Sequence, residues 1–381
     1  MDSDQEIKPT IIIDNGSCFI KSGLGNEDEP SSYFRNCIGY PKMDSKYSDL
    51  SGKEFFIGKN ALIRKDSLSL NYPIKNGAIQ NWDDMEKIWG YIFYDELKVD
   101  PVEHNILLTQ QIMNPKGEKE KSAQIIFETF FAPGLYFDYS TSLSLYGAGK
   151  FTGLILELGG ETTQIAPILD GNPKPYKFEK LFYGGNEIND YLFNLFNSNL
   201  KMFYNSKYKS CIEDIKEKAC YVALDFEEEL YGIEQYDYTL PDNKQLILKE
   251  ERIKAPEAIF KPSFIGKDDD KSLHNLCNKL IEKFDDHNEK KDLYNCIVLS
   301  GGNSMFKGLA ERLTKEIKAI VPDSLQEEVN VINLPQRKFF AWVGGAILSS
   351  ISKFKDLVIT KQMYEESGSS IFYKNDCYIF K

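Results

Sequence analysis

An acidic residue beside a glycine pair is the first feature of this sequence that could do chemistry. The segment "LILELGGETTQIAPILDG", residues 154–171, has an apolar run, the turn Gly159-Gly160 and a second apolar run, with Glu157 just before the turn. This pattern predicts two strands joined by a tight turn. Backbone N–H groups in such a turn can surround a phosphate, although this segment alone is also typical of an ordinary hairpin turn. If it is a phosphate site, its role is either catalytic or only binding.

The same plan occurs near the N-terminus. The segment "IIIDNGSCFIKSGL", residues 11–24, also has three apolar β-formers, an acid, a glycine-bearing turn with a hydroxyl and a returning strand. An Asp-Asn-Gly run by itself is also typical of an ordinary hairpin turn. Its repetition a domain's length away favours a duplicated α/β architecture with two facing turns.

A third glycine pair follows a predicted strand over residues 297–299. Gly301-Gly302 precedes a helix whose apolar face is predicted to hold Leu309, Leu313, Ile317 and Ile320. A strand, a glycine turn and a helix N-terminus present free N–H groups to an anion. Many α/β connections, however, use glycine only for a tight turn.

Regular helices are expected to support these turns. Asn81 is predicted to cap a helix with the buried stripe Met85, Ile88, Trp89, Ile92 and Phe93. A second helix is expected to bury Ile212, Ile215, Ala219 and Val222 and to project Lys216 and Glu217 from its other side. The polar segments 41–56 and 266–275 are expected to be loops.

Length and composition limit the function classes. A chain of 381 residues is expected to form two or three domains, and 42% hydrophobic and 27% charged residues fit a soluble globular protein. The net charge of −12 argues against direct nucleic-acid binding, and no apolar run is long enough for membrane insertion. The N-terminus lacks the features of a signal peptide. Seven scattered cysteines fit reduced thiols and show no metal-ligand spacing.

Several longer blocks carry a resemblance to a known family. "IIIDNGS", "YPIKNGAIQNWDDMEKIW", "DIKEKACYVALDFEEE", "APEAIFKPSFIG", "VLSGGNSMFKG" and "YEESGSSI" are collinear from about residue 10 to 371 and strongly resemble actin and actin-related proteins. The resemblance implies the fold class shared with sugar kinases and heat-shock ATPases. In this α/β fold two duplicated lobes surround a nucleotide cleft. The expected outer lobe is 1–147 with 340–381, including a small tip at 36–72. The expected inner lobe is 148–339, including a smaller subdomain at 184–267.

The resemblance also implies cofactors, ATP or ADP with Mg²⁺, and residues that hold them. Ser17 and the backbone at Gly16, Gly159 and Gly160 are expected to meet the phosphates, Lys21 to supply charge, and Asp14 and Glu157 to orient the waters of Mg²⁺. Cys18 stands where the family keeps glycine, which costs about 1–2 kcal/mol if the position needs positive φ. The positions matching the ribose and adenine site are Gly185, Lys216, Glu217, Gly301, Gly302, Met305, Phe306 and Lys338.

Hydrolysis is predicted to be weak or lost. Where the family positions its attacking water with glutamine, aspartate and histidine, this chain has Ser140, Glu157 and Gln164. Ser140 is too short, Glu157 adds a methylene, and Gln164 cannot relay a proton as imidazole does. Glu161 also adds a carboxylate beside the expected phosphates.

Interaction surfaces are the other implication of the resemblance. An apolar cleft for amphipathic helices of actin-binding proteins is expected at Tyr146, Gly147, Gly149, Gly171, Val343, Ile347, Leu348 and Ile351. An alternative is that these residues only seal the hinge of the two lobes. Filament contacts are expected to be altered. In the tip loop only Met43, Tyr47 and Leu50 could insert into a neighbouring subunit. The segment 264–266 matches the apolar plug between the strands of the family's filament, but Asp268, Asp269 and Asp270 follow it here.

The leading interpretation is a nucleotide-binding, actin-like protein of the cytoplasm and cytoskeleton that acts through assembly with actin-like subunits, its own or others. One alternative is an active ATPase coupled to polymerisation. Another is a nuclear actin-related subunit of a chromatin complex that does not polymerise.

Overall fold

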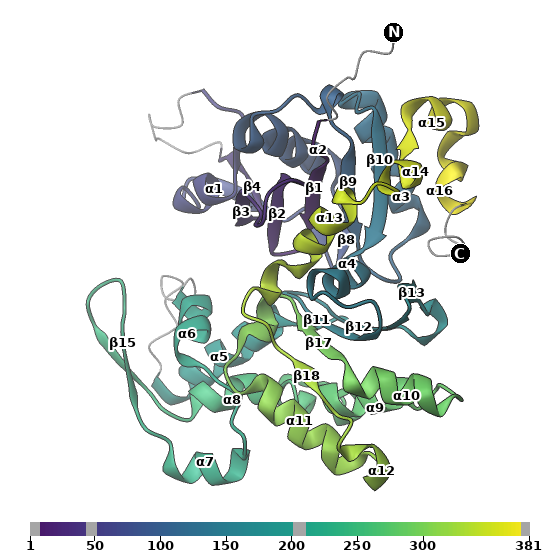
Figure 1. Ribbon diagram of the computed structural model, residues 1–381. Coiled ribbons are helices and arrows are strands. Elements are labelled where there is room, and N and C mark those ends of the chain that lie inside the picture. The colour runs from purple at the N-terminus through teal and green to yellow at the C-terminus, as the bar shows by residue number, and fades with distance from the viewer. Residues whose placement is uncertain (1–7, 43–51, 201–210, 375–381) are drawn as a thin grey trace. The chain divides into compact units, whose positions relative to one another are not determined.

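The computed structural model describes residues 8–42, 52–200 and 211–374 (Figure 1). The expected tip-loop contacts Met43, Tyr47 and Leu50 and the C-terminal tail 375–381 lie outside these ranges. The chain divides into two compact units, the first formed by Met1–Phe151 with Phe339–Lys381 and the second by Thr152–Lys338. Each unit has its own six-stranded sheet, so the expected duplicated α/β architecture is present. None of the helices in the described part of the chain has the length and apolarity needed to cross a bilayer.

The sheet of unit 1 has the order β19-β10-β9-β1-β2-β3. Strand β1 pairs antiparallel with β2 and parallel with β9, and β9 is parallel to β10. The carboxyl ends of three parallel strands therefore meet at one edge, where ligands of open α/β sheets usually bind. The strands are β1 Ile11–Asn15, β2 Phe19–Leu24, β3 Ser32–Arg35, β9 Ile106–Gln110, β10 Gly134–Tyr139 and β19 Ile359–Thr360.

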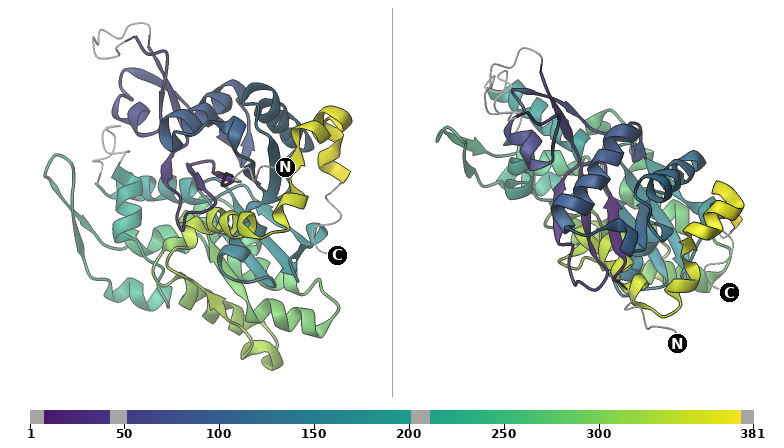
Figure 2. Two further views of the ribbon diagram at one scale, coloured as in Figure 1. Left: turned by 45° about the horizontal axis from the view of Figure 1, so that its top comes forward. Right: turned by 90° about the horizontal axis from the view of Figure 1, so that it is seen from above.

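Helices cover this sheet as the apolar stripes require. Asn81 caps α2 by accepting the N–H of Asp84 at 3.0 Å, and the predicted stripe of α2 and the following π-helix Ile92–Leu97 is fully buried. The C-terminal helices return to unit 1, where β19 pairs with β10 and Tyr364 stacks on Phe127 (Figure 2). The helices are α1 Lys59–Ile63, α2 Trp82–Tyr91, α3 Lys116–Gln124, α4 Ser140–Gly147, α13 Phe340–Ser350, α14 Phe354–Leu357, α15 Lys361–Ser367 and α16 Ile371–Lys374.

A small sheet projects from unit 1 within residues 36–72. Strand β4 pairs with both β5 and β6, and Cys37, Phe56, Ala61 and Leu68 form a separate small core. A two-stranded ribbon, β7 with β8, follows it. The strands are β4 Ile38–Pro41, β5 Phe56–Ile57, β6 Leu68–Asn71, β7 Ile74–Lys75 and β8 Ala78–Ile79.

The sheet of unit 2 repeats the arrangement of unit 1. Strand β11 pairs antiparallel with β12 and parallel with β17, which is parallel to β18, and β14 pairs with β12. A separate ribbon joins β15 and β16. The strands are β11 Gly153–Leu158, β12 Thr163–Leu169, β13 Asn172–Pro173, β14 Glu179–Leu181, β15 Tyr236–Thr239, β16 Gln245–Leu248, β17 Ile297–Ser300 and β18 Val331–Ile332.

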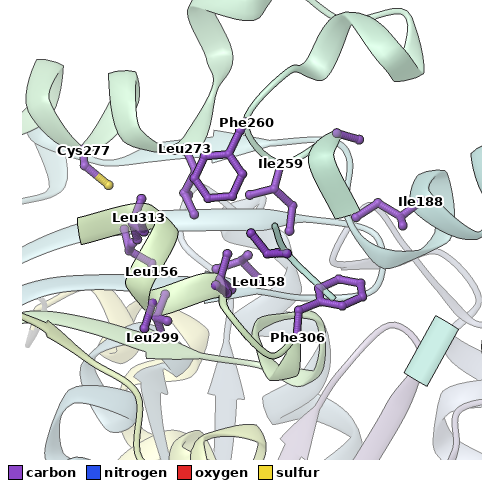
Figure 3. Close-up of a cluster of buried hydrophobic side chains, with 14 of the residues drawn as sticks. Leu156, Leu158, Ile188, Ile259, Phe260, Leu273, Cys277, Leu299, Phe306 and Leu313 are labelled. Atoms are coloured by element: carbon purple, nitrogen blue, oxygen red, sulfur yellow. The ribbon is translucent and has the colours of Figure 1, made fainter. Parts of the chain in front are cut away.

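One hydrophobic core joins the sheet of unit 2 to its helices. Leu156, Leu158 and Leu299 of the sheet pack with Leu313 of α11 and Phe260 in this cluster (Figure 3). The helices are α5 Gly185–Leu200, α6 Ile212–Ala219, α7 Phe226–Gly232, α8 Glu251–Glu257, α9 Leu273–Ile281, α10 His287–Asn295, α11 Leu309–Ile320 and α12 Asp323–Gln326.

Three expectations for these helices were wrong. Ile320 is 39% exposed because it is the last residue of α11, beyond the turn that packs inward. Lys216 does not project to solvent, because its side chain is buried and donates to a backbone carbonyl. The segment 266–275 is not all loop, since it contains the turn Asp269–Lys271 and the start of α9.

A buried carboxyl lies in unit 1 where β10 passes into α4. Asp138 accepts the N–H of Tyr139 at 2.7 Å and the hydroxyl of Tyr136 at 3.3 Å. Burial raises the pKa of Asp138 from 3.8 to about 7, and these two hydrogen bonds offset only part of the shift. On the same side, α13 packs closely on α4 (Figure 1). A Cβ at Gly344 would collide with Leu143 O, so glycine is needed for this close approach.

We expect unit 1 to lose stability as the pH rises from about 4 to about 7. The folded state holds a proton on Asp138 over this interval, whereas the unfolded chain, with a pKa near 3.8, has released it. Asp138→Asn removes the titrating group. The midpoint of urea unfolding of this variant should therefore change less with pH, and at pH 8 it should be higher than that of the unaltered protein. Parallel pH profiles for the two proteins would contradict this account.

Candidate functional site

The turn of unit 1 that is expected to meet phosphate is built on a cross-strand ion pair. Asp14 of β1 lies opposite Lys21 of β2, and Lys21 Nζ donates to Asp14 Oδ2 at 2.8 Å. Thr109, at the carboxyl end of the parallel strand β9, donates its hydroxyl to Asp14 Oδ1 at 2.9 Å. Both oxygens of a carboxylate that is only 6% exposed are thus held, and its direction is fixed.

Two further residues hold the backbone of this turn, and the sequence analysis did not find them. The side chain of Asn36 donates to Gly16 O at 3.0 Å, and its backbone N–H donates to Cys18 O at 2.9 Å. Trp89 Nε1 donates to Asn15 Oδ1 at 3.2 Å. Asn36 is fully buried directly after β3, and its context in the sequence, between Arg35 and Cys37, gives no signal for this role.

Ser17 carries an unused hydroxyl at the centre of the turn. Its side chain is 8% exposed, and Ser17 Oγ finds no hydrogen-bond partner among the residues that the structure describes. Buried hydroxyls are nearly always paired, so this atom indicates a missing acceptor or donor. Neither Gly16 nor Cys18 has positive φ. The backbone strain considered for Cys18 is therefore absent, and Gly16 is required because a Cβ there would collide with Phe19 O.

The corresponding turn of unit 2 is tied to the start of α5. Gly185 N donates to Gly159 O at 3.0 Å, and Asn186 N donates to Gly160 O at 2.7 Å. Lys216 Nζ donates to Gly185 O at 3.0 Å, which explains why this lysine is buried. Four predicted site residues that are far apart in sequence are thus brought together.

The third glycine pair is fixed by a residue that the sequence analysis missed. Arg337 is buried, its guanidinium donates twice to Ser304 O, and its carbonyl accepts Gly301 N at 3.2 Å and the hydroxyl of Ser300. Gly301 has φ 87° and ψ 159°, a conformation almost confined to glycine. The helix expected after this glycine pair does not follow it directly. Gly302–Met305 is a 3₁₀ turn, and α11 begins only at Leu309.

Glu157 and Gln164 contact each other directly. They are opposite in the β11–β12 register, and Gln164 Nε2 donates to Glu157 Oε1 at 2.8 Å. Gln164 is 1% exposed and Glu157 is half-buried. Ser140, the third predicted catalytic position, is buried at the first residue of α4 in unit 1.

The other predicted ribose and adenine residues differ in how open they are. Glu217 is exposed, Met305 is 38% exposed and Lys338 is half-buried. Phe306 belongs to the hydrophobic core of unit 2, so little of its ring is open to a ligand (Figure 3). Asn303 lies beside Gly185, and its Oδ1 has no hydrogen-bond partner in the described ranges.

A protein-family model described as Actin matches residues 5–376 of the chain. This chain belongs to the actin family. Its expected actin-like fold class is therefore confirmed, with nearly the whole length of the chain covered. Actin-family proteins generally bind a nucleotide with a divalent metal.

The residues present fit a nucleotide with its metal. The unpaired Ser17 Oγ and Asn303 Oδ1 are in the two places where this actin-family chain is expected to meet phosphate and nucleoside. No group of three or more His, Cys, Asp or Glu residues that could hold a metal directly occurs in the described part of the chain. Asp14 in unit 1 and Glu157 in unit 2 are the carboxylates expected to orient the waters of the metal. Burial raises the pKa of Glu187 in the first turn of α5, and the nearby Glu161, which follows Gly159-Gly160, raises it further.

The expected partner cleft of this actin-family chain is only partly exposed. Leu348 is 5% exposed and Tyr146 is 4% exposed, because both pack into the core beneath α13 and α4. They are not surface anchors, which corrects the expectation that a partner helix would bury Leu348. Ile347 and Ile351 are each 44% exposed, and Gly149 is exposed in a turn. Val343 is half-buried against the same core, and Gly171 turns β12 into β13 in unit 2.

Two of the three carboxylates that follow the segment 264–266 accept hydrogen bonds from backbone N–H groups of this chain. Asp269 Oδ1 accepts Ser263 N at 2.8 Å, and Asp268 Oδ1 accepts Asp270 N at 3.2 Å. All three carboxylates remain exposed. Burying this surface in a filament would therefore require their desolvation or pairing.

We expect Gly301→Ala to destabilise unit 2 by at least about 1–3 kcal/mol, since Gly301 has a backbone conformation that alanine avoids and a Cβ there would collide with Leu158 O. Gly302→Ala is the matched control, because a Cβ at Gly302 meets no atom within 4 Å. Urea unfolding of the nucleotide-free proteins measures both effects. Equal losses of stability in the two variants would contradict the role assigned to Gly301.

Proposed function

We propose that this actin-family protein binds ATP or ADP with Mg²⁺ through the glycine turns of both units and hydrolyses ATP slowly or not at all. In this proposal the protein acts mainly through assembly with actin-like subunits and through contacts with partner proteins. The observation that carries the nucleotide part is the buried Ser17 hydroxyl, which has no partner among the described residues.

The surroundings of Ser17 support a phosphate as the missing partner. Lys21 lies on the adjacent strand and provides positive charge, and Asn36 holds two carbonyls of the turn. Because those carbonyls are engaged, they do not compete for the hydroxyl of Ser17. A phosphate oxygen is an acceptor that would satisfy this hydroxyl, and charge-assisted hydrogen bonds of this kind are the stronger ones.

Ser17→Ala should have opposite effects with and without nucleotide. Without nucleotide, removing an unpaired buried hydroxyl should leave the unfolding midpoint unchanged or raise it, because such a group costs about 1–3 kcal/mol. With Mg²⁺ and excess ATP, the unaltered protein should gain more thermal stability than the variant, because it binds ATP more tightly. Thermal unfolding with and without Mg²⁺-ATP checks both expectations.

Ser22→Ala is the matched control for this test. Ser22 Oγ is also buried and without a partner in the described ranges, but it lies on β2 away from the turn. This variant should gain stability without changing the effect of ATP. Equal stabilisation of Ser17→Ala and the unaltered protein by ATP would overturn the proposed contact. No stabilisation of any of the three, with no nucleotide released from the denatured protein, would overturn nucleotide binding.

Slow hydrolysis follows from what the side chains at the three expected catalytic positions can do. Gln164 has no titrating proton and its amide N–H is already donated to Glu157. Ser140 is buried at the start of α4, and its side chain is too short to reach as a glutamine would. A displacement of about 1 Å in a positioned group can cost roughly a hundredfold in rate. Ser140 and Gln164 therefore do not supply, at their two expected positions, the proton-accepting group that an imidazole provides.

Phosphate release from Mg²⁺-ATP should be far slower for this protein than for a conventional actin measured beside it. Restoring the family residues with Ser140→Gln, Glu157→Asp and Gln164→His together should raise the rate, because the water would again be positioned and its proton accepted. Measuring bound nucleotide in the same samples separates loss of binding from loss of chemistry. Turnover at the rate of conventional actin in the unaltered protein would contradict the proposal.

The exposed residues of the partner surface support a smaller contact than the sequence suggested. Ile347 lies in the last turn of α13, Ile351 is the residue that directly follows the helix, and the two are equally exposed. Such a pair suits the apolar face of an amphipathic helix, whose anchors recur at similar spacing. We propose Ile347 and Ile351 as the anchoring positions, with Leu348 serving the core beneath them.

A further inference from the structure

The Glu157–Gln164 contact repeats the geometry of the ion pair in unit 1. In each unit an acid on the first strand of the central hairpin lies directly opposite a donor on the returning strand. Lys21 Nζ donates to Asp14 at 2.8 Å, and Gln164 Nε2 donates to Glu157 at 2.8 Å. The duplication therefore extends from the fold to a pair of side chains at the equivalent position in each turn.

The position of Gln164 is itself fixed by its surroundings, so its side chain can orient a neighbouring side chain. Its backbone is paired on both sides, with Glu157 of β11 and with Lys180 of β14, and its side chain is 1% exposed. A carboxylate has only acceptor sites, so the amide must present its N–H to Glu157. Glutamate has one more rotatable bond than the aspartate expected here, and this hydrogen bond restrains that extra freedom.

Ser300, on the other side of Glu157, is engaged elsewhere. It is opposite Glu157 in the parallel β11–β17 register, but its hydroxyl donates to Arg337 O at 3.2 Å. Ser300 therefore helps to fix the Gly301 turn, whereas Gln164 contacts the acid itself. The two neighbours of Glu157 have separable roles.

We propose that Gln164 is a positioning residue that aims the Glu157 carboxylate at the waters of the nucleotide-bound Mg²⁺, in place of any role in proton transfer. The inference rests on the proposed nucleotide function and specifies how its metal is held. Partners that orient a metal's ligands typically contribute a factor of 10–100 to metal affinity. The same factor is expected here, and it should be confined to the Mg²⁺-dependent part of ATP binding.

The test compares ATP affinity with Mg²⁺ and with EDTA, using displacement of a fluorescent ATP analogue. Gln164→Leu should weaken ATP binding about 10- to 100-fold in Mg²⁺ and leave it unchanged in EDTA. Glu157→Gln should show a similar loss. The double variant should lose no more than the larger single loss, because the two residues act as one unit.

Two further variants separate positioning from general structure. Ser300→Ala, on the opposite side of Glu157, should change affinity equally in Mg²⁺ and EDTA. In Gln164→Glu, Mg²⁺ should no longer raise ATP affinity at pH 8, because the new carboxylate repels Glu157. The increase in affinity with Mg²⁺ should return as the pH falls, because a protonated glutamate can donate a hydrogen bond as the amide does. This pH-dependent recovery would not arise from a packing defect, and it applies even if Gln164→Leu folds poorly.

The outcomes distinguish the inference from the function on which it rests. If Gln164→Leu binds ATP and Mg²⁺ raises its ATP affinity as much as in the unaltered protein, the positioning role alone is overturned. Equal loss in Mg²⁺ and EDTA, or additive losses in the double variant, also overturns it. Absence of ATP binding by the unaltered protein overturns the proposed function and the inference together.

Discussion

The register of the two central hairpins is the constraint on which the rest of the structure depends. Directly opposed residues of antiparallel strands point to the same face, and a slip by one residue would reverse every side chain. The β1–β2 register places Lys21 beside Asp14, and the β11–β12 register places Gln164 beside Glu157. Each acid is thereby directed at the carboxyl edge of its sheet, where the glycine turns begin. The fully buried faces of both hairpins make any other register costly.

Buried polar groups define how each turn is held. Asn36, Thr109 and Arg337 lose water on burial, and each recovers hydrogen bonds from backbone or carboxylate groups of a turn. Leaving one buried donor unpaired costs about 1–3 kcal/mol of stability. These networks therefore allow little variation in the position of the turn. Ser17 Oγ is one of several buried polar atoms, Ser22 Oγ among them, that have no partner in the described ranges. Its place in a glycine turn next to the strand that carries Lys21 is what favours a ligand at Ser17.

The same hairpins explain how an actin-family protein could keep nucleotide while losing its chemistry. Binding phosphate requires backbone N–H groups, a hydroxyl and positive charge, which the turns and Lys21 provide. Hydrolysis additionally requires a group that accepts a proton, and the amide of Gln164 cannot do so. That amide instead donates to Glu157 Oε1, so in the proposed function Gln164 holds its neighbour in place and does not accept a proton. Such a protein would use nucleotide as a fixed part of its structure, and its partner surfaces would carry its function.

The sequence by itself determined the α/β class, the duplicated hairpins, the Asn81 cap and the buried stripe of α2, because each depends on local periodicity or on a few adjacent residues. The actin-like blocks also gave the family, and from it the turns on which the candidate site is expected. Only the tertiary structure showed that Leu348 and Lys216 are buried, that the helix after Gly302 begins later, and that Cys18 is unstrained. It alone showed Asn36 and Arg337 at the turns and Gln164 bound to Glu157. These facts depend on contacts among residues far apart in the chain, and a pattern along the sequence does not encode which neighbour a side chain will meet.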